Sequence, residues 1–163
     1  MAYAKKSVSL QLMFEVRRDA IEKSRNTDIG ERTFWLIKEM CEVLYTARKI
    51  GILAIDPDVG NVYIPPEAPF SNDIKLALDY VVNSDEYLTE LLTGRYWVKN
   101  LQGEDALIYY LLISAANKIP YLTPEELETL LLSCLPDEAA ARYKEYKKSG
   151  CKSHTEKEFE QSE

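Results

Sequence analysis

The side chains that most often carry catalysis are sparse in this sequence. Its only histidine, His154, lies in a polar C-terminal stretch, and the three cysteines Cys41, Cys134 and Cys151 stand far apart without a CxxC pair. The chain has no glycine-rich phosphate loop and no HExxH or GxSxG motif. A nucleophilic cysteine needs a positioned base, whereas Cys41 and Cys134 fall on apolar helical stripes. We therefore expect buried structural thiols, no catalytic residue, no cofactor and no conventional enzyme activity.

One acidic segment comes close to the pattern of a calcium-binding loop. Asp56, Asp58 and Glu67 match positions 1, 3 and 12 of that pattern. Position 6, which needs glycine for a sharp turn, is Asn61, and the pair of prolines at 65–66 blocks the helix that should follow. The sequence therefore predicts no calcium site in this segment, and no other metal site.

Eleven tyrosines are many for a chain of this length. Tyr109 and Tyr110 lie in an apolar stretch, and we expect their rings in the core. Tyr96 and Trp97 fit a core or a partner-binding interface equally, because both rings supply large amphipathic contact area. A pocket between helices is the alternative use of such rings, and Trp35 would line it together with Tyr109 and Tyr110.

The elements that would position these residues are helices, because apolar residues recur at helical spacing along most of the chain. Four prolines in the segment 56–69 prevent a helix there and predict a long loop. The expected helices cover residues 8–23, 31–54, 70–82, 84–94, 102–118, a segment that begins at Thr123, and 136–148. Ser84 is expected to cap the fourth of these helices. The sixth should begin with a capping box of Thr123 and Glu126, with Pro124 at the first helical position. The sequence thus predicts an all-α, single-domain bundle of about seven helices in residues 1–148 with one long proline-rich loop. The polar tail at 149–163 is expected to be disordered.

Composition restricts the class of partner. The 163 residues are 46% hydrophobic and 29% charged, which is typical of a globular domain, and the net charge of −7 disfavours nucleic acid as a partner. The longest stretch without charged or strongly polar residues, 106–116, is shorter than the ~20 residues of a membrane span. The N-terminus lacks the features of a cleaved signal peptide, and an odd number of separated cysteines suits reduced thiols. We expect a cytoplasmic protein that neither inserts into membranes nor binds nucleic acid.

A longer stretch of the sequence carries a family-like pattern. Residues 47–56 read ARKIGILAID, Pro69 and Phe70 follow, and residues 76–84 read LALDYVVNS before Leu88, Leu91 and Leu92. This stretch, about 44–92, resembles the cytoplasmic segment of flagellar stator subunits of the MotA type. Those subunits are membrane proteins, whereas this chain continues after Leu92 without a span. The resemblance therefore concerns the cytoplasmic helical module alone, and proton-driven torque generation is not expected.

The resemblance implies two partner-binding residues. In that family a basic residue and an acidic residue eight positions later meet opposite charges on the rotor switch protein, and the matching positions are Arg48 and Asp56. Such charges steer docking more than they tighten it. The residues themselves also allow a structural interpretation, in which Arg48 offsets a helix dipole and Asp56 begins a turn.

Together these observations favour a non-catalytic helical module that binds another protein. Its predicted partner-binding residues are Arg48, Asp56, Tyr96 and Trp97. The alternative is a small-molecule-binding or regulatory helical domain with its pocket at Trp35, Tyr109 and Tyr110. Self-association through an exposed apolar helix face is compatible with both.

Overall fold

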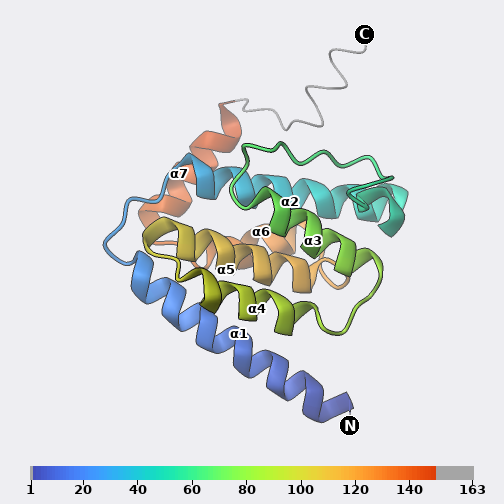
Figure 1. Cartoon of the computed structure of the whole chain (residues 1–163). Helices are drawn as coiled ribbons and strands as arrows, with labels where there is room; N and C mark the ends of the chain where they lie inside the picture. The colour runs from blue at the N-terminus through green and yellow to red at the C-terminus, as the bar shows by residue number, and fades with distance from the viewer. Residues whose placement is uncertain (1, 150–163) are drawn as a thin grey trace.

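The most apolar segment of the sequence forms the central helix of the bundle, α5 (Gly103–Lys118). Every residue from Ala106 to Ala116 is buried, as expected for a helix that is apolar around its whole circumference. Five other helices pack against it, and Figure 1 shows it at the centre of the molecule. The computed structural model describes residues 2–149, with side chains from residue 8 onward.

The described chain is all-α, in agreement with the predicted fold class. It contains seven α-helices and one short 3-10 helix, and no strand among residues 2–149. Besides α5, the helices are α1 (Ala2–Ser24), α2 (Glu31–Ile50), η1 (Ile52–Ile55), α3 (Ser71–Val82), α4 (Leu88–Lys99), α6 (Pro124–Leu132) and α7 (Asp137–Lys148). The predicted tail lies outside the described residues apart from Ser149, and so do Cys151 and His154.

Three helix boundaries differ from the prediction. The helix α1 begins at Ala2 instead of about Val8, and α2 ends at Ile50 because Gly51 adopts φ 125°, which no helix continues. The helix α4 passes through Gly94 and ends at Lys99, five residues later than predicted. The buried side chains of Leu92 and Tyr96 on either side of Gly94 hold this helix against the core, which outweighs the low helix propensity of glycine.

The start of α4 was also predicted wrongly. Ser84 has φ 52° and therefore lies outside the helix, so it cannot serve as the N-cap. Asp85 instead accepts a hydrogen bond from the backbone N–H of Tyr87 at 2.8 Å, and the helix begins at Leu88. The acidic residues before α4 thus form a turn.

The predicted start of α6 is confirmed in detail. The hydroxyl of Thr123 accepts from the backbone N–H of Glu126 at 3.2 Å, and the carboxylate of Glu126 accepts from the backbone N–H of Thr123 at 3.4 Å. Pro124 occupies the first helical position. These contacts form a complete capping box, in which each residue satisfies the other's backbone N–H.

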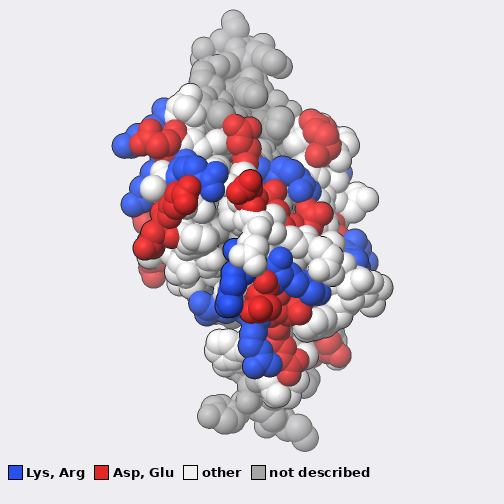
Figure 2. Space-filling view, turned by 90° about the vertical axis from the view of Figure 1, so that its left-hand side faces the viewer, with Lys and Arg blue, Asp and Glu red and all other residues white. Residues whose placement is uncertain are grey.

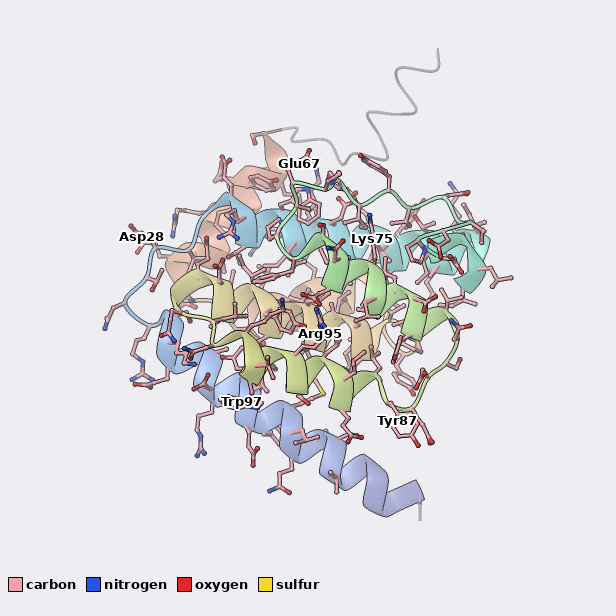
Figure 3. The ribbon with its side chains drawn as sticks, viewed as in Figure 1. Asp28, Glu67, Lys75, Tyr87, Arg95 and Trp97 are labelled. Carbon is pink, nitrogen blue, oxygen red and sulfur yellow. The ribbon has the colours of Figure 1, made fainter. Side chains whose placement is uncertain are left out.

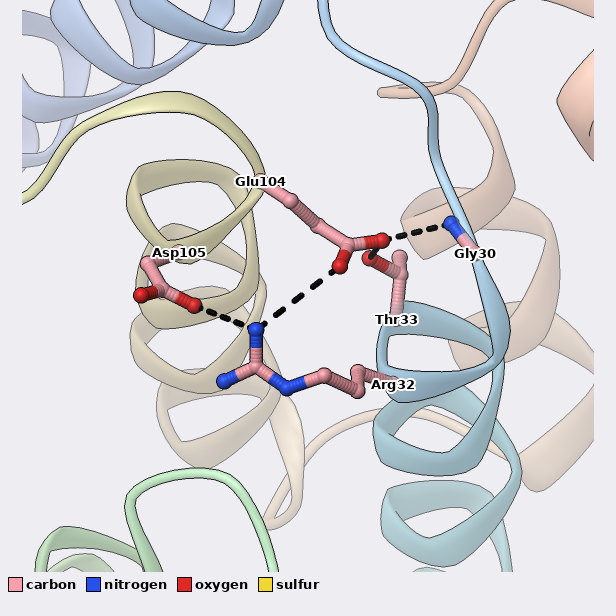
Figure 4. A network of polar contacts seen from close by, with 5 residues as sticks. All are labelled: Gly30, Arg32, Thr33, Glu104 and Asp105. Atoms are coloured by element: carbon pink, nitrogen blue, oxygen red, sulfur yellow. Dashed lines mark hydrogen bonds and ion pairs between the residues drawn. The ribbon is translucent and has the colours of Figure 1, made fainter.

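The N-termini of α2 and α5 are joined by polar contacts (Figure 4). The carboxylate of Glu104 accepts from the backbone N–H of Gly30 at 2.5 Å and from the hydroxyl of Thr33 at 3.1 Å. Arg32 lies 2.7 Å from Asp105 and 3.8 Å from Glu104. Gly30 has no side chain with which to cap α2, so a carboxylate distant in the sequence satisfies the helix terminus.

Candidate functional site

Arg48 is bound to the chain itself. Its Nη2 atom donates to the carbonyl oxygens of Ile119 at 2.7 Å and Leu122 at 2.8 Å, in the connection between α5 and α6. Both carbonyls lie past the last helical residue of α5, where a cation offsets the negative end of the helix dipole. The structure therefore gives Arg48 a structural role, and its predicted contact with a partner stays a prediction.

Asp56 has a structural role as well. Its Oδ1 atom accepts from the backbone N–H groups of Asp58 at 2.8 Å and Val59 at 3.3 Å, which is the geometry of an Asx turn. The carboxylate thus shapes the start of the long loop. Nothing in these contacts tests whether a partner also meets the Asp56 charge.

The paired aromatic residues of α4 divide between core and surface. Tyr96 is only 1% exposed, and its hydroxyl donates to the Asp19 carboxylate at 2.6 Å. Burial and this carboxylate both raise the pKa of Tyr96 well above its ordinary value. The prediction of an exposed, partner-binding Tyr96 is therefore wrong, because its ring lies under α1. Trp97 is exposed, with the Lys23 ammonium 6.0 Å from its ring centroid.

The rings of Trp35, Tyr109 and Tyr110, which were predicted to line a ligand pocket, pack against core side chains instead. Tyr109 and Tyr110 are buried in the core, as predicted, and Tyr109 meets the ring of Phe70 edge to face with centroids 5.1 Å apart. Trp35 is half-buried and packs against the same core. Neither of the two surface hollows described below is lined by these three rings.

The first hollow lies between α2, α6 and α7. Its volume is about 180 Å³, below the roughly 300–1,000 Å³ of most small-molecule sites. Glu128 accepts from the Tyr143 hydroxyl at 3.0 Å and from the Lys147 ammonium at 2.8 Å. Burial, together with the nearby Glu128 carboxylate, raises the pKa of the Cys41 thiol to about 12. The thiol is therefore protonated at neutral pH, as in a structural cysteine.

A buried carboxylate that sequence reasoning missed joins α3 to α4. Asp73 is 3% exposed and lies 2.5 Å from the Nε atom of Arg95 and 3.3 Å from the Nζ atom of Lys99. Figure 3 shows Arg95 between the two helices. Burial and the nearby Asp73 carboxylate raise the pKa of the neighbouring Tyr109 hydroxyl to about 12, although Arg95 lowers it. The only sequence signal was the i, i+4 spacing of Arg95 and Lys99 on one side of a helix.

The most exposed apolar residues of α2 and the segment after it form a compact projection, residues 50–60, which we call the α2 knob. Leu53 is 69% and Val59 81% exposed, and Ile50 and Ile52 are exposed beside them. Ile55 is fully buried and anchors the knob to the bundle. Sequence reasoning treated Ile52 as part of a helical stripe and did not identify this exposed group.

Hydrogen bonds hold the α2 knob in one conformation. The backbone N–H of Gly60 donates to Asp56 at 2.9 Å, and that of Asn61 donates to Ala54 at 2.7 Å. A Cβ atom at position 60 would lie 2.3 Å from the Ala54 carbonyl oxygen, so only glycine fits this turn. The knob is thus a pre-organised apolar surface.

The opposite end of the molecule has a different character. Figure 2 views the end formed by the N-termini of α2 and α5, where basic and acidic side chains of the described residues alternate without a broad area of one sign. A mixed surface of this kind is typical of a solvated face. It contrasts with the aliphatic α2 knob at the other end of α2.

Comparison with known proteins gives no family assignment. The chain matches no protein-family model, no curated protein and no solved structure. No helix within residues 2–149 is both long and apolar enough to cross a membrane. Over the same residues, no group of three or more His, Cys, Asp or Glu side chains is placed to hold a metal ion.

Proposed function

We propose that this chain is a protein-binding module and that its partner docks on the α2 knob. The observation that carries the proposal is the exposure of Leu53 and Val59, at 69% and 81%, on a turn held by backbone hydrogen bonds. Burial of one aliphatic side chain stabilises a complex by about 1.5–3 kcal/mol. Exposed apolar groups of this kind mark interaction sites in soluble proteins.

The rigidity of the α2 knob supports the same proposal. A surface that is ordered before binding loses little conformational entropy when the partner arrives. The knob also has exposed charged residues beside its aliphatic side chains, since Lys49 directly precedes it and Asp58 is next to Val59 in the sequence. An apolar centre with a polar rim is the usual composition of a protein–protein interface. The partner should therefore offer a shallow apolar depression.

The resemblance to stator subunits suggests the identity of the partner. Arg48 precedes the α2 knob by two residues and Asp56 lies within it, so a switch-like protein that meets those charges would also lie close to Leu53. We propose this identity for the partner, and a cytoplasmic location in keeping with the unpaired thiols of Cys41 and Cys134. Recovery of a flagellar switch component would support it, and recovery of a reproducible but unrelated partner would contradict it.

The experiment is quantitative affinity capture from the native source with the full chain as bait. We expect Leu53→Asp combined with Val59→Asp to lose at least about tenfold of a partner that wild type retains, because both introduced carboxylates would be desolvated in the complex. The control is Phe14→Asp, which places the same charge on an exposed residue of α1. Circular dichroism checks that all variants are folded. Equal capture by the knob variant and wild type would overturn the proposal.

A further inference from the structure

The helix α4 is apolar on two opposite faces. Its inner face places Leu88, Leu92 and Tyr96 in the core. A second apolar row follows its outer side with spacings of four, three and four residues, beginning at Tyr87 directly before the first helical residue. We call it the α4 outer face: Tyr87, Leu91, Gly94 and Val98. A surface helix normally carries polar residues on the side away from the core. An uncovered apolar row on that side indicates that something packs against it.

The α4 outer face is open and slightly hollowed. A shallow groove of about 490 Å³ is lined by Leu91, Gly94 and Val98 together with charged residues of the same helix. Within residues 2–149, and apart from the adjoining backbone of α4 itself, no atom lies within 4 Å of the point where a Cβ of Gly94 would stand, and Val98 is 86% exposed. Nothing in the described chain requires glycine at this position, because its φ is ordinary for a helix and the space around it is empty. Its missing side chain does leave room for a second helix to approach closely.

We propose that the α4 outer face binds the same face of a second copy of this chain, as a parallel and two-fold symmetric helix pair. Spacings of four, three and four residues are those of the a and d positions of a coiled coil, which bring two identical helices together along one seam. In a symmetric pair each residue near the axis meets its own copy. Leu91 and Val98 would then pack against their counterparts, with the two Gly94 backbones close together between them.

Charge complementarity selects a second copy and fixes its direction. Glu90 and Arg95 flank the row on opposite sides, five residues apart, which correspond to positions g and e of successive heptads. Parallel pairing places Glu90 of each copy beside Arg95 of the other, so two ion pairs form by symmetry. Antiparallel pairing would place the two arginines on the same side of the seam. Arg95 also binds Asp73, and its guanidinium has five N–H donors with which to serve both carboxylates.

The expected dimer is weak because α4 has only twelve residues and its outer face is small compared with a stable interface. Sedimentation equilibrium of the full chain over a wide concentration range should therefore show the mass rise from 18.7 kDa toward twice that value. We expect Val98→Glu to raise the dimer dissociation constant by at least about tenfold, because a carboxylate would enter the seam. The control is Val59→Glu on the α2 knob, which is similarly exposed and should leave the dimer unchanged.

Each outcome decides the proposal. A wild-type chain that stays monomeric at every concentration overturns it, as does a dimer that Val98→Glu leaves unchanged. A dimer lost equally in Val59→Glu would assign self-association to the α2 knob and overturn the α4 assignment. Capture of a partner through Leu53 and Val59 does not enter this test, so failure here and failure of the proposed function are separate results.

The parallel direction has its own test. In a parallel pair the two copies of residue 98 face each other, and Val98→Cys should form an intermolecular disulfide under mild oxidation much faster than wild type, whose native cysteines give the background rate. Tyr87→Cys should cross-link in the same way at the other end of the row. If Val98→Glu abolishes the dimer while both cysteine variants cross-link only at the background rate, the parallel arrangement is wrong.

Discussion

The guanidinium of Arg48 on α2 lies 2.7 Å from the carbonyl oxygen of Ile119, which follows the last residue of α5. The same nitrogen reaches the carbonyl oxygen of Leu122 at 2.8 Å. One side chain of α2 thus closes the end of the central helix and fixes the turn that leads into α6. Arg48 therefore contributes to folding whether or not a partner also meets its charge.

Loss of these contacts should destabilise the fold. We expect Arg48→Gln to lower the free energy of unfolding by about 1–3 kcal/mol, because a hydrogen bond from a charged donor contributes in that range and two carbonyls lose their partner. Urea denaturation at neutral pH measures the change. The control is Lys49→Gln, which removes an ammonium 5.6 Å from the ring centroid of the exposed Tyr45. Equal effects of the two substitutions would contradict the structural role of Arg48.

Two glycine-to-alanine substitutions should have opposite effects on stability. Gly60→Ala introduces a methyl group 2.3 Å from a backbone oxygen, and we expect a loss of about 2 kcal/mol or more together with weaker partner capture. Gly94→Ala fills open space in the middle of α4 and should raise stability by up to about 1 kcal/mol. Thermal unfolding at low protein concentration, where any dimer is dissociated, compares the two. A neutral Gly60→Ala would show that the α2 knob is not fixed by this turn.

The buried thiol of Cys41 should make stability depend on alkaline pH. Its pKa is about 12 in the folded chain against an ordinary 9.0, so below pH 9 the thiol is protonated in both the folded and the unfolded state and has no effect on the pH dependence. Above pH 9 the unfolded chain loses the proton first, and stability falls with rising pH by roughly 1 kcal/mol per pH unit. Urea denaturation at pH 7.5 and pH 10 should show a smaller decline for Cys41→Ala than for wild type. The buried tyrosines change stability in the same sense in both proteins, so the difference between the two declines measures the thiol together with its effect on the neighbouring Tyr143 hydroxyl.

Local rules account for the parts of the fold that the sequence predicted. The run from Ala106 to Ala116 is apolar on every side and could only be a central helix, and Thr123 with Glu126 carries a complete start signal within four residues. At these two segments the prediction and the structure agree.

Tertiary contacts decide the rest. Gly94 predicts a helix end, but α4 continues beyond it because Leu92 and Tyr96 on either side pack into the core. Tyr96 and Trp97 are adjacent aromatic residues, yet Tyr96 packs under α1 and Trp97 is exposed to solvent. Their orientations depend on the rotation of α4 about its axis, which the sequence alone does not determine. The ion pair of Asp73 with Arg95 joins residues on two helices, and its existence depends on how those helices pack.

The docking of α1 on α5 has a consequence for the order of folding. These two helices form the most extensive contact of the bundle, yet α5 begins only at Gly103, far along the chain from the end of α1 at Ser24. During synthesis the apolar side of α1 therefore emerges long before its covering helix exists. Val16 and Ala20 then have no core to enter until α5 is made. A chaperone therefore finds the most exposed apolar surface while only the N-terminal half of the chain has been made.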